Sequence, residues 1–342
     1  MRVGILGTGA IANKHAQAYR NIGFEIAACW NKTESRGRDF AERWGAAFVP
    51  DYEKLCRFPG LDFVDVCTFP DFRLEPVQIC AEIRRPIQVQ KPIATNLDTA
   101  RAMINTARFA GIPLSVASQH RFDDSTMFLK RALPAGRLGK LLEADAYVKW
   151  YRSDEYYSRP IKGSWQVEGG GALINQAIHQ IDVLLYLMGP IEAVSGMWQL
   201  GARHTIESED VVNAVMAYWS GATGVVQAST AIWPGYTERI EMHGTKGTAV
   251  LSGDRLTSWD VQDDESANAL DPAPLQHDVA SGSSDPMAIS LTSFERQFLD
   301  FADAIRAKRP PVSDGEEGYR ALEVVLGIYR SCRAGERVKL RS

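Results

Sequence analysis

Residues 1–12 read Met-Arg-Val-Gly-Ile-Leu-Gly-Thr-Gly-Ala-Ile-Ala and carry the strongest structural signal in the chain. An apolar run at 3–6 is typical of a buried strand, the glycines interrupt it, and the following residues can continue as a helix. In that context Gly-x-Gly-x-x-Ala favours a dinucleotide-binding fingerprint. Gly7 permits the turn, Gly9 leaves room for a pyrophosphate, and the helix N-terminus offers N–H groups to it. The alternative is a glycine turn in another kind of α/β domain.

Strand and helix patterns alternate through the first third of the chain. The strand candidates are 3–6, 24–30, 47–49, 63–68, 86–89 and 114–117, and the helix candidates are 13–19, 35–44, 76–83 and 97–110. Repeated βα units predict a parallel, doubly wound sheet, so the fold class is α/β. Ligands bind beyond the carboxyl ends of such strands. We therefore expect the site in the segments that follow them.

Composition narrows the class of protein. The chain has 342 residues, enough for two domains, and its 45% hydrophobic and 23% charged content is ordinary for a globular protein. A net charge of −4 gives no basic field for nucleic acid, and no apolar run approaches the ~20 residues that span a membrane. The five cysteines form no Cys-x-x-Cys pair, which predicts reduced core residues and no metal site. Without a leader pattern, we expect a cytoplasmic protein.

The segment after the second strand bears on cofactor choice. An Asp or Glu there binds the ribose 2′-hydroxyl and repels a 2′-phosphate, but this chain has Asn31-Lys32-Thr33. Asn31 carries no repelling charge, Lys32 could pair with phosphate, and Thr33 could donate a hydrogen bond. The segment favours NADP(H) over NAD(H); the alternative is a polar turn with a solvated lysine.

Two further segments carry candidate chemistry. Lys91 follows a strand, where its amine would point into the ligand crevice, although a solvated lysine is the alternative. Residues 169–171 are three glycines that would let the backbone approach the cofactor, and a helical pattern runs over 172–187. Asn175, His179 and Asp182 are spaced i, i+4 and i+7, so they are expected to share one helix face. Such a stripe indicates an active site or a satisfied buried network.

Taken in order, residues 7–12, Thr68 with Pro70, Lys91-Pro92, and the glycine-led helix with His179-x-x-Asp182 resemble the Gfo/Idh/MocA oxidoreductases. These include glucose-fructose oxidoreductase and inositol dehydrogenase. Arg121-Phe122, Gly136-x-x-Gly139 and Asp314-Gly315 extend the resemblance over nearly the whole chain. It implies a Rossmann domain at 1–120 and an α+β domain at 121–342 with a large, open, mostly antiparallel sheet. It also allows the final helix to pack against the Rossmann domain. A homodimer or homotetramer is expected.

The resemblance also implies a catalytic Lys, Asp and His acting on sugars or polyols. The Lys matches Lys91 and the His matches His179, whereas the Asp falls on Asn175. Two other departures are Gln90, where the family has Glu, and Arg73, where a His is common. Removing nearby negative charges should leave His179 more readily neutral and less basic.

The predicted site has three sets of residues. The catalytic set is Lys91, His179 and Asn175. The cofactor-binding set is Gly7, Thr8, Gly9, Ala10, Ile11, Asn31, Lys32, Thr33, Thr68, Pro70, Arg73, Gln90, Lys91 and Arg121. The substrate-binding set is Arg152, Tyr156, Trp165, Asn175, His179 and Asp182. The first three of the substrate set belong to a basic, aromatic segment suited to sugar faces and hydroxyls, with a polar surface loop as the alternative.

The predicted function is NAD(P)-dependent hydride transfer between a nicotinamide and a secondary carbinol or ketone of a sugar, polyol or sugar derivative. His179 would act as general base, and Lys91 would stabilise the negative charge that develops on the substrate oxygen. One alternative is a glycosidase that oxidises a sugar carbon transiently and eliminates the aglycone. Another is a non-catalytic dinucleotide or sugar sensor. No nucleic-acid or membrane partner is expected.

Overall fold

The computed structural model describes residues 1–159, 161–262 and 290–341, and the chain divides into two compact units. Unit 1 comprises Met1–Gln119 and Ser290–Leu322; unit 2 comprises His120–Ile289 and Glu323–Ser342. The division after residue 119 lies one residue before the predicted domain boundary. Helix α10 (Gly315–Ala334) contributes its first residues to unit 1 and the rest to unit 2.

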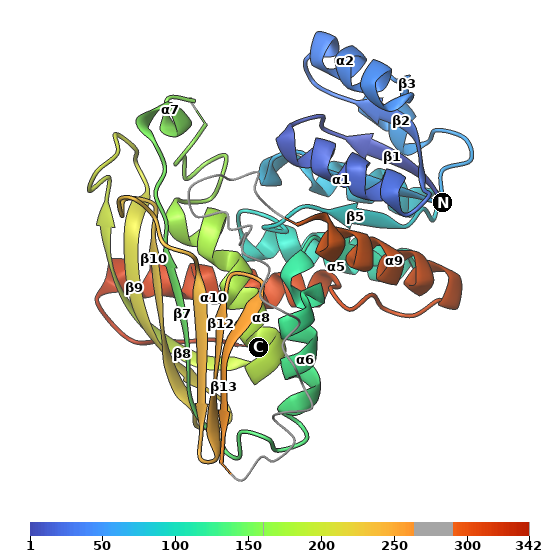
Figure 1. Cartoon of the computed structure of the whole chain (residues 1–342). Helices are drawn as coiled ribbons and strands as arrows, with labels where there is room; N and C mark the ends of the chain where they lie inside the picture. The colour runs from blue at the N-terminus through green and yellow to red at the C-terminus, as the bar shows by residue number, and fades with distance from the viewer. Residues whose placement is uncertain (160, 263–289, 342) are drawn as a thin grey trace. The chain divides into compact units, whose positions relative to one another are not determined.

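Unit 1 contains a six-stranded parallel sheet in the order β3-β2-β1-β4-β5-β6 (Figure 1). Its strands are β1 (Arg2–Leu6), β2 (Glu25–Trp30), β3 (Ala47–Phe48), β4 (Phe63–Val66), β5 (Ile87–Val89) and β6 (Leu114–Val116). Its helices are α1 (Ala10–Asn21), α2 (Glu34–Trp44), α3 (Tyr52–Cys56), α4 (Leu74–Glu82), α5 (Leu97–Ala110) and α9 (Leu291–Ala307). The strand order reverses between β1 and β4, which is where doubly wound sheets bind their ligands. The predicted α/β class is confirmed.

A late segment of the chain completes the core of unit 1. Phe298 of α9 stacks on Tyr19 of α1, with ring centroids 4.2 Å apart. Gln297 donates through Nε2 to the carbonyl of Val116 and accepts from the N–H of Ser118. The two helices therefore share a buried apolar contact, and polar side chains tie α9 to the end of β6.

Unit 2 contains the predicted large, mostly antiparallel sheet, in the order β13-β12-β11-β7-β10-β9-β8-β14. The strands are β7 (Leu141–Lys149), β8 (Ile191–Leu200), β9 (Glu209–Tyr218), β10 (Thr223–Ser229), β11 (Arg239–Gly244), β12 (Gly247–Ser252), β13 (Arg255–Val261) and β14 (Val338–Lys339). Among the described strands of this sheet, only β7 and β10 pair in parallel. Helices α6 (Asp124–Ala132) and α8 (Ile178–Met188) lie along one face (Figure 1).

The start of the predicted helix 172–187 differs from an α-helix. Leu173–Ala177 form a π-helical turn, and α8 begins only at Ile178. Asn175 lies in this π-turn and His179 in the first turn of α8, so the shared face expected for these two residues stays a prediction. Single π-turns of this kind occur frequently at functional sites.

No helix among the described residues combines the length and the hydropathy that crossing a membrane requires.

Candidate functional site

The fingerprint loop follows β1 in unit 1. Gly7 has φ +89°, and a Cβ there would lie 3.0 Å from the carbonyl carbon of Cys67, so both the backbone and the packing require glycine. A Cβ on Gly9 would have nothing within 4 Å. Gly9 is the N-cap of α1 and provides no side-chain cap, so the first N–H groups of the helix face this open position. The loop has the shape and the donors that a pyrophosphate needs.

The amide of Asn31 holds the end of β2 in place. Its Oδ1 accepts from the N–H of Thr8 at 3.2 Å, and its Nδ2 donates to the carbonyl of Thr33 at 2.9 Å. The neighbouring Lys32 side chain is exposed. The positions at which an acid would exclude a 2′-phosphate therefore carry an amide, an amine and a hydroxyl.

Arg73 links the segments that follow β4 and β5. Its Nε and Nη2 donate to the carbonyl of Thr68 at 3.1 and 2.7 Å, and its Nη1 donates to the carbonyls of Gln90 and Pro92. Burial lowers the pKa of Arg73 to about 9. These contacts favour a positioning role for Arg73; its predicted contact with the cofactor stays a prediction.

Gln90 points into a buried polar network. Its Nε2 lies 2.7 Å from Nε2 of His15, whose Nδ1 lies 2.6 Å from Oδ2 of Asp65. The hydroxyl of Tyr19 donates to the same carboxylate oxygen at 2.8 Å. The network joins α1, β4 and the segment after β5. Sequence reasoning missed it, although a histidine and an aspartate inside apolar patterns were a visible signal.

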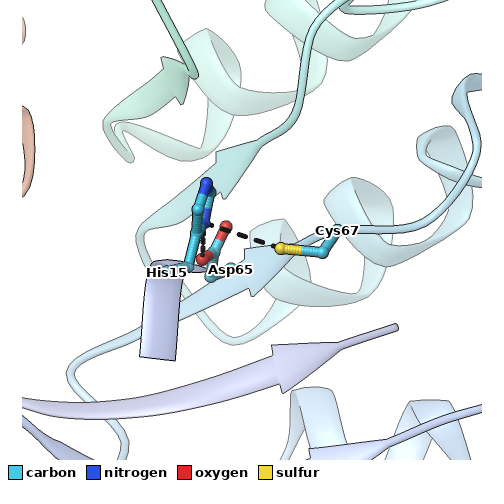
Figure 2. Close-up of side chains that lie close together, drawn as sticks. All are labelled: His15, Asp65 and Cys67. Atoms are coloured by element: carbon cyan, nitrogen blue, oxygen red, sulfur yellow. Dashed lines mark hydrogen bonds and ion pairs between the residues drawn. The ribbon is translucent and has the colours of Figure 1, made fainter. Parts of the chain in front are cut away.

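Figure 2 shows His15 and Asp65 beside Cys67, a set that could in principle hold a metal ion. Ligand atoms 2.0 Å from one tetrahedral zinc lie about 3.3 Å apart, whereas these imidazole and carboxylate atoms lie 2.6 Å apart. Burial also raises the pKa of the Cys67 thiol well above its usual value, which opposes the thiolate that a metal needs. The geometry fits a hydrogen-bonded core pair better than a metal site.

In unit 2, Asn175 and His179 are partly exposed on the π-turn and the first turn of α8. Asp182, one turn further along, is buried and binds Arg121 in bidentate fashion, at 2.8 and 2.7 Å. That geometry satisfies both charges. The pairing favours a structural role for Arg121 and Asp182, and their contacts with cofactor and substrate stay predictions.

Two of the three glycines before the π-turn, Gly170 and Gly171, lie close to other protein atoms. A Cβ on Gly171 would collide with the carbonyl of Glu209, and one on Gly170 would collide with the ring of Tyr329. The Glu209 carboxylate accepts 2.8 Å bonds from the N–H groups of Gly171 and Leu173 and from the hydroxyl of Tyr329. Burial raises the pKa of Glu209 to about 7, although these bonds oppose the rise. Packing around Glu209 and Tyr329 accounts for Gly170 and Gly171, and the close approach of a cofactor stays a prediction.

Two of the three predicted aromatic and basic substrate residues lie together. Nη2 of Arg152 donates to Oε1 of Gln176 at 3.3 Å, and Nε2 of Gln176 donates to the hydroxyl of Tyr156 at 3.2 Å. Gln176 adjoins Asn175 on the π-turn and was not singled out from the sequence. Trp165 belongs to a different cluster, where its Nε1 donates to the carbonyl of Glu207 and its ring packs on Tyr329.

His120 was also missed. Its Nδ1 lies 2.8 Å from Oδ2 of Asp123, and its ring meets that of His179 edge to face, with centroids 5.3 Å apart and an interplanar angle of 84°. Burial alone would lower the pKa of His120, but the charges of Asp123, Glu238 and Asp254 outweigh it and raise the pKa to about 9. The His-x-x-Asp spacing was the available sequence signal.

Both units match known protein families. Residues 1–118 match the model described as an oxidoreductase family with an NAD-binding Rossmann fold, and residues 126–250 match the GFO/IDH/MocA C-terminal domain.

Relatives are similar over nearly their whole length. Myo-inositol 2-dehydrogenase of Thermotoga maritima is 26% identical, over 99% of this chain and 98% of its own. D-glucoside 3-dehydrogenase of Escherichia coli is 26% identical, over 99% and 97%. The structure of WlbA dehydrogenase from Bordetella pertussis, in complex with NADH and UDP-GlcNAcA, superposes with a TM-score of 0.87 at 25% identity, covering 100% of this chain and 98% of that one.

Proposed function

Because the chain belongs to the Gfo/Idh/MocA oxidoreductase family, we propose that it moves a hydride between a nicotinamide dinucleotide and a secondary carbinol or ketone of a sugar or polyol. Relatives named as dehydrogenases of inositol and of glucosides support this substrate class. The identity of the sugar is left to experiment.

The open Gly9 position and the uncapped N-terminus of α1 fit a dinucleotide pyrophosphate. When bound, the nicotinamide supplies the hydride acceptor or donor. Gly7, Thr8, Gly9, Ala10 and Ile11 would hold the pyrophosphate, and Thr68 and Pro70 would border the nicotinamide end.

Cofactor preference follows from the end of β2. We propose that NADP(H) is accepted at least as well as NAD(H), because Asn31 brings no negative charge and Lys32 is free to approach a 2′-phosphate. The WlbA structure contains NADH, so NAD(H) use is the competing outcome. Dissociation constants for the two cofactors, measured for the wild type and Asn31→Asp, decide between them: the substitution should shift preference toward NAD(H).

His179 and Lys91 carry the proposed chemistry. In the oxidation direction a ring nitrogen of His179 accepts the hydroxyl proton, while the Lys91 amine stabilises the negative charge on the same oxygen. Asn175 and Gln176 on the π-turn, with Arg152 and Tyr156, would bind the remaining hydroxyls. Removing a general base lowers the rate about 10²–10⁴-fold.

One observation carries this proposal: His179 is partly exposed and so accessible to a substrate, whereas nearby Arg121 and Asp182 are buried. Free sugars, inositols and sugar acids should be tested for reduction of NAD⁺ and NADP⁺ by the absorbance of the reduced nicotinamide. His179→Gln and Lys91→Met should each lose kcat by at least about 10²-fold while still binding the dinucleotide. Release of an aglycone without net cofactor reduction would indicate the glycosidase, and binding without turnover the sensor.

We also propose a homo-oligomer formed through the open sheet face of unit 2. Met197 and Val215 lie on neighbouring strands and point to the same side, with 81% and 55% of their surfaces exposed. Exposed apolar residues on a regular sheet are candidates for a subunit interface. Light scattering should give a mass above that of one chain, and Met197→Glu with Val215→Glu should lower it; a monomeric wild type contradicts the proposal.

A further inference from the structure

His120 has no counterpart in the family's catalytic set of Lys, Asp and His, yet it contacts His179 directly. It precedes α6, and its imidazole lies 2.8 Å from the carboxylate of Asp123, the N-cap residue of that helix. The His179 ring lies 5.3 Å from the His120 ring, measured between centroids. His120 therefore lies between a fixed negative charge and the proposed general base.

The surroundings of His120 are acidic on several sides. A small cavity beside it is lined by Asp123, Gln180, Glu238 and Arg239. Glu238 precedes β11, and Asp254, in the turn between β12 and β13, also acts on His120. Arg239 is the basic group in this lining, and its Nε contacts Glu241. Because the negative charges around His120 outnumber the positive ones, they favour a proton on both of its ring nitrogens.

Gln180 adds a polar atom to the same cavity. It follows His179 on α8, and its Oε1 is buried with no hydrogen-bond donor among the described residues. The N-cap of α6, the first turn of α8 and the segment before β11 thus contribute polar side chains to the cavity beside His120.

We propose that His120, held by Asp123 as an imidazolium, keeps His179 neutral in the free enzyme and so ready to accept the substrate proton. The inference rests on the proposed function for the direction of catalysis. Two imidazolium rings at this separation repel each other, so the charge on His120 disfavours a second proton on His179. His120 acts through His179 and is a positioning residue.

The substitution of Asn175 for the family's Asp complements this arrangement. Nδ2 of Asn175 donates to the carbonyl of Gly170 at 3.1 Å, a bond that an ionised Asp could not make. Position 175 thus lacks the negative charge that would stabilise a protonated His179. Position 120 instead carries a positive charge that disfavours protonation of His179.

Histidine titration tests the coupling without any substrate. The ring signals of the six histidines should be followed against pH in isotope-labelled full-length protein, and assigned by single substitutions such as His179→Gln. The titration midpoint of His179 should move to higher pH in His120→Gln, because this substitution removes the positive charge at position 120. Asp123→Asn should move it the same way, because His120 then loses its proton more easily. His243→Gln, a histidine of β11 that contacts Thr248, is the matched control and should move nothing.

Activity supplies the second measurement. At a pH of about 6, His120→Gln should lose about three- to tenfold in kcat for oxidation relative to the wild type, and recover above pH ~8 where His179 is neutral in both. A purely structural role for His120 would lower kcat equally at all pH values.

Three results would separate the hypotheses. An unmoved His179 midpoint in His120→Gln overturns the coupling, as does a His120 that is already neutral at pH 7. Failure to oxidise any sugar or polyol, with the midpoint shift present, overturns the proposed function and leaves the coupling in place.

Discussion

Arg73 is a buried cation whose hydrogen bonds, within the described residues, all go to backbone carbonyls. Buried charges are usually paired with an opposite charge, and its lowered pKa reflects the desolvation that this arrangement leaves uncompensated. The carbonyls belong to two loops at neighbouring strand ends. One side chain therefore fixes the backbone on both sides of Lys91.

Replacing Arg73 should separate positioning from cofactor binding. Arg73→Met leaves three carbonyls without a donor, so we expect a loss of about 3 kcal/mol in the free energy of unfolding. The loosened Lys91 loop should lower kcat about tenfold. The dissociation constant of the dinucleotide should change by less than about threefold. Arg73→Lys should recover part of both losses.

The exposed Arg57, which pairs with Glu53 and Glu82, is the control for this experiment. Arg57→Met should cost less than about 1 kcal/mol. A folded Arg73→Met protein that no longer binds the dinucleotide would instead place Arg73 in the cofactor site.

Single elements show which parts of the fold the sequence predicts. Helix α5 begins and ends at the predicted residues, because Asn96 caps its start and Gly111 takes the left-handed conformation at its end. Both signals are local. Strand β8 and helix α6 were not predicted, although Asp123 precedes α6 and Gly189-Pro190 precedes β8. The π-turn could not be predicted either, because Glu209 and Tyr329 shape it from distant positions in the sequence.

The residues of the candidate site also fall into two groups: those that local sequence patterns predict, and those whose roles depend on contacts formed only by folding. The fingerprint loop, Lys91 and His179 were found from motifs that lie within a few residues. His120 could have been found from its i, i+3 spacing to Asp123. The roles of Arg73 and Glu209 could not, because both depend on backbone groups brought close only by folding.

The turn around Glu209 should make stability depend on pH. The folded protein holds the Glu209 proton more tightly than the unfolded chain, so the free energy of unfolding should fall as pH rises from about 4.5 to about 7. The full difference corresponds to about 3 kcal/mol. Urea unfolding at several pH values should show this slope in the wild type and a shallower one in Glu209→Gln. The exposed Glu143→Gln is the control and should keep the wild-type slope; parallel curves for Glu209→Gln would refute the assignment.

The fingerprint loop allows a substitution that should weaken dinucleotide binding without disturbing the packing of the protein. A Cβ on Gly9 meets no protein atom, and the backbone there has φ −72°, so Gly9→Val should fold normally. The added side chain should weaken dinucleotide binding at least about tenfold, or about 1.4 kcal/mol. Fluorescence titration measures this directly, with Gly9→Ala expected to lie between. Undiminished binding in a folded Gly9→Val protein would exclude the loop as the pyrophosphate site.

At the scale of the molecule, unit 1 depends on a segment that the chain adds late. Phe298 is fully buried against Tyr19 and His15, although about 280 residues separate it from them in the sequence. Phe298→Ala should destabilise the protein by about 3–5 kcal/mol. Phe109 is 87% exposed, so Phe109→Ala should change stability by less than about 0.5 kcal/mol. Equal unfolding midpoints for the two variants would contradict the observed packing.

Unit 1 is formed by two segments that are far apart in the sequence, so its folding during synthesis on the ribosome is delayed. The core of unit 1 cannot be completed by Met1–Gln119 until Ser290–Leu322 has been synthesised. About 170 residues of unit 2 are made in between. At about 5–20 residues per second the wait lasts roughly ten to thirty seconds. Throughout it, the faces of Tyr19 and His15 that Phe298 will cover are open to solvent, and a chaperone that binds apolar surface has time to reach them. We expect nascent chains arrested before residue 290 to be cut by protease within unit 1, and chains arrested beyond residue 322 to resist.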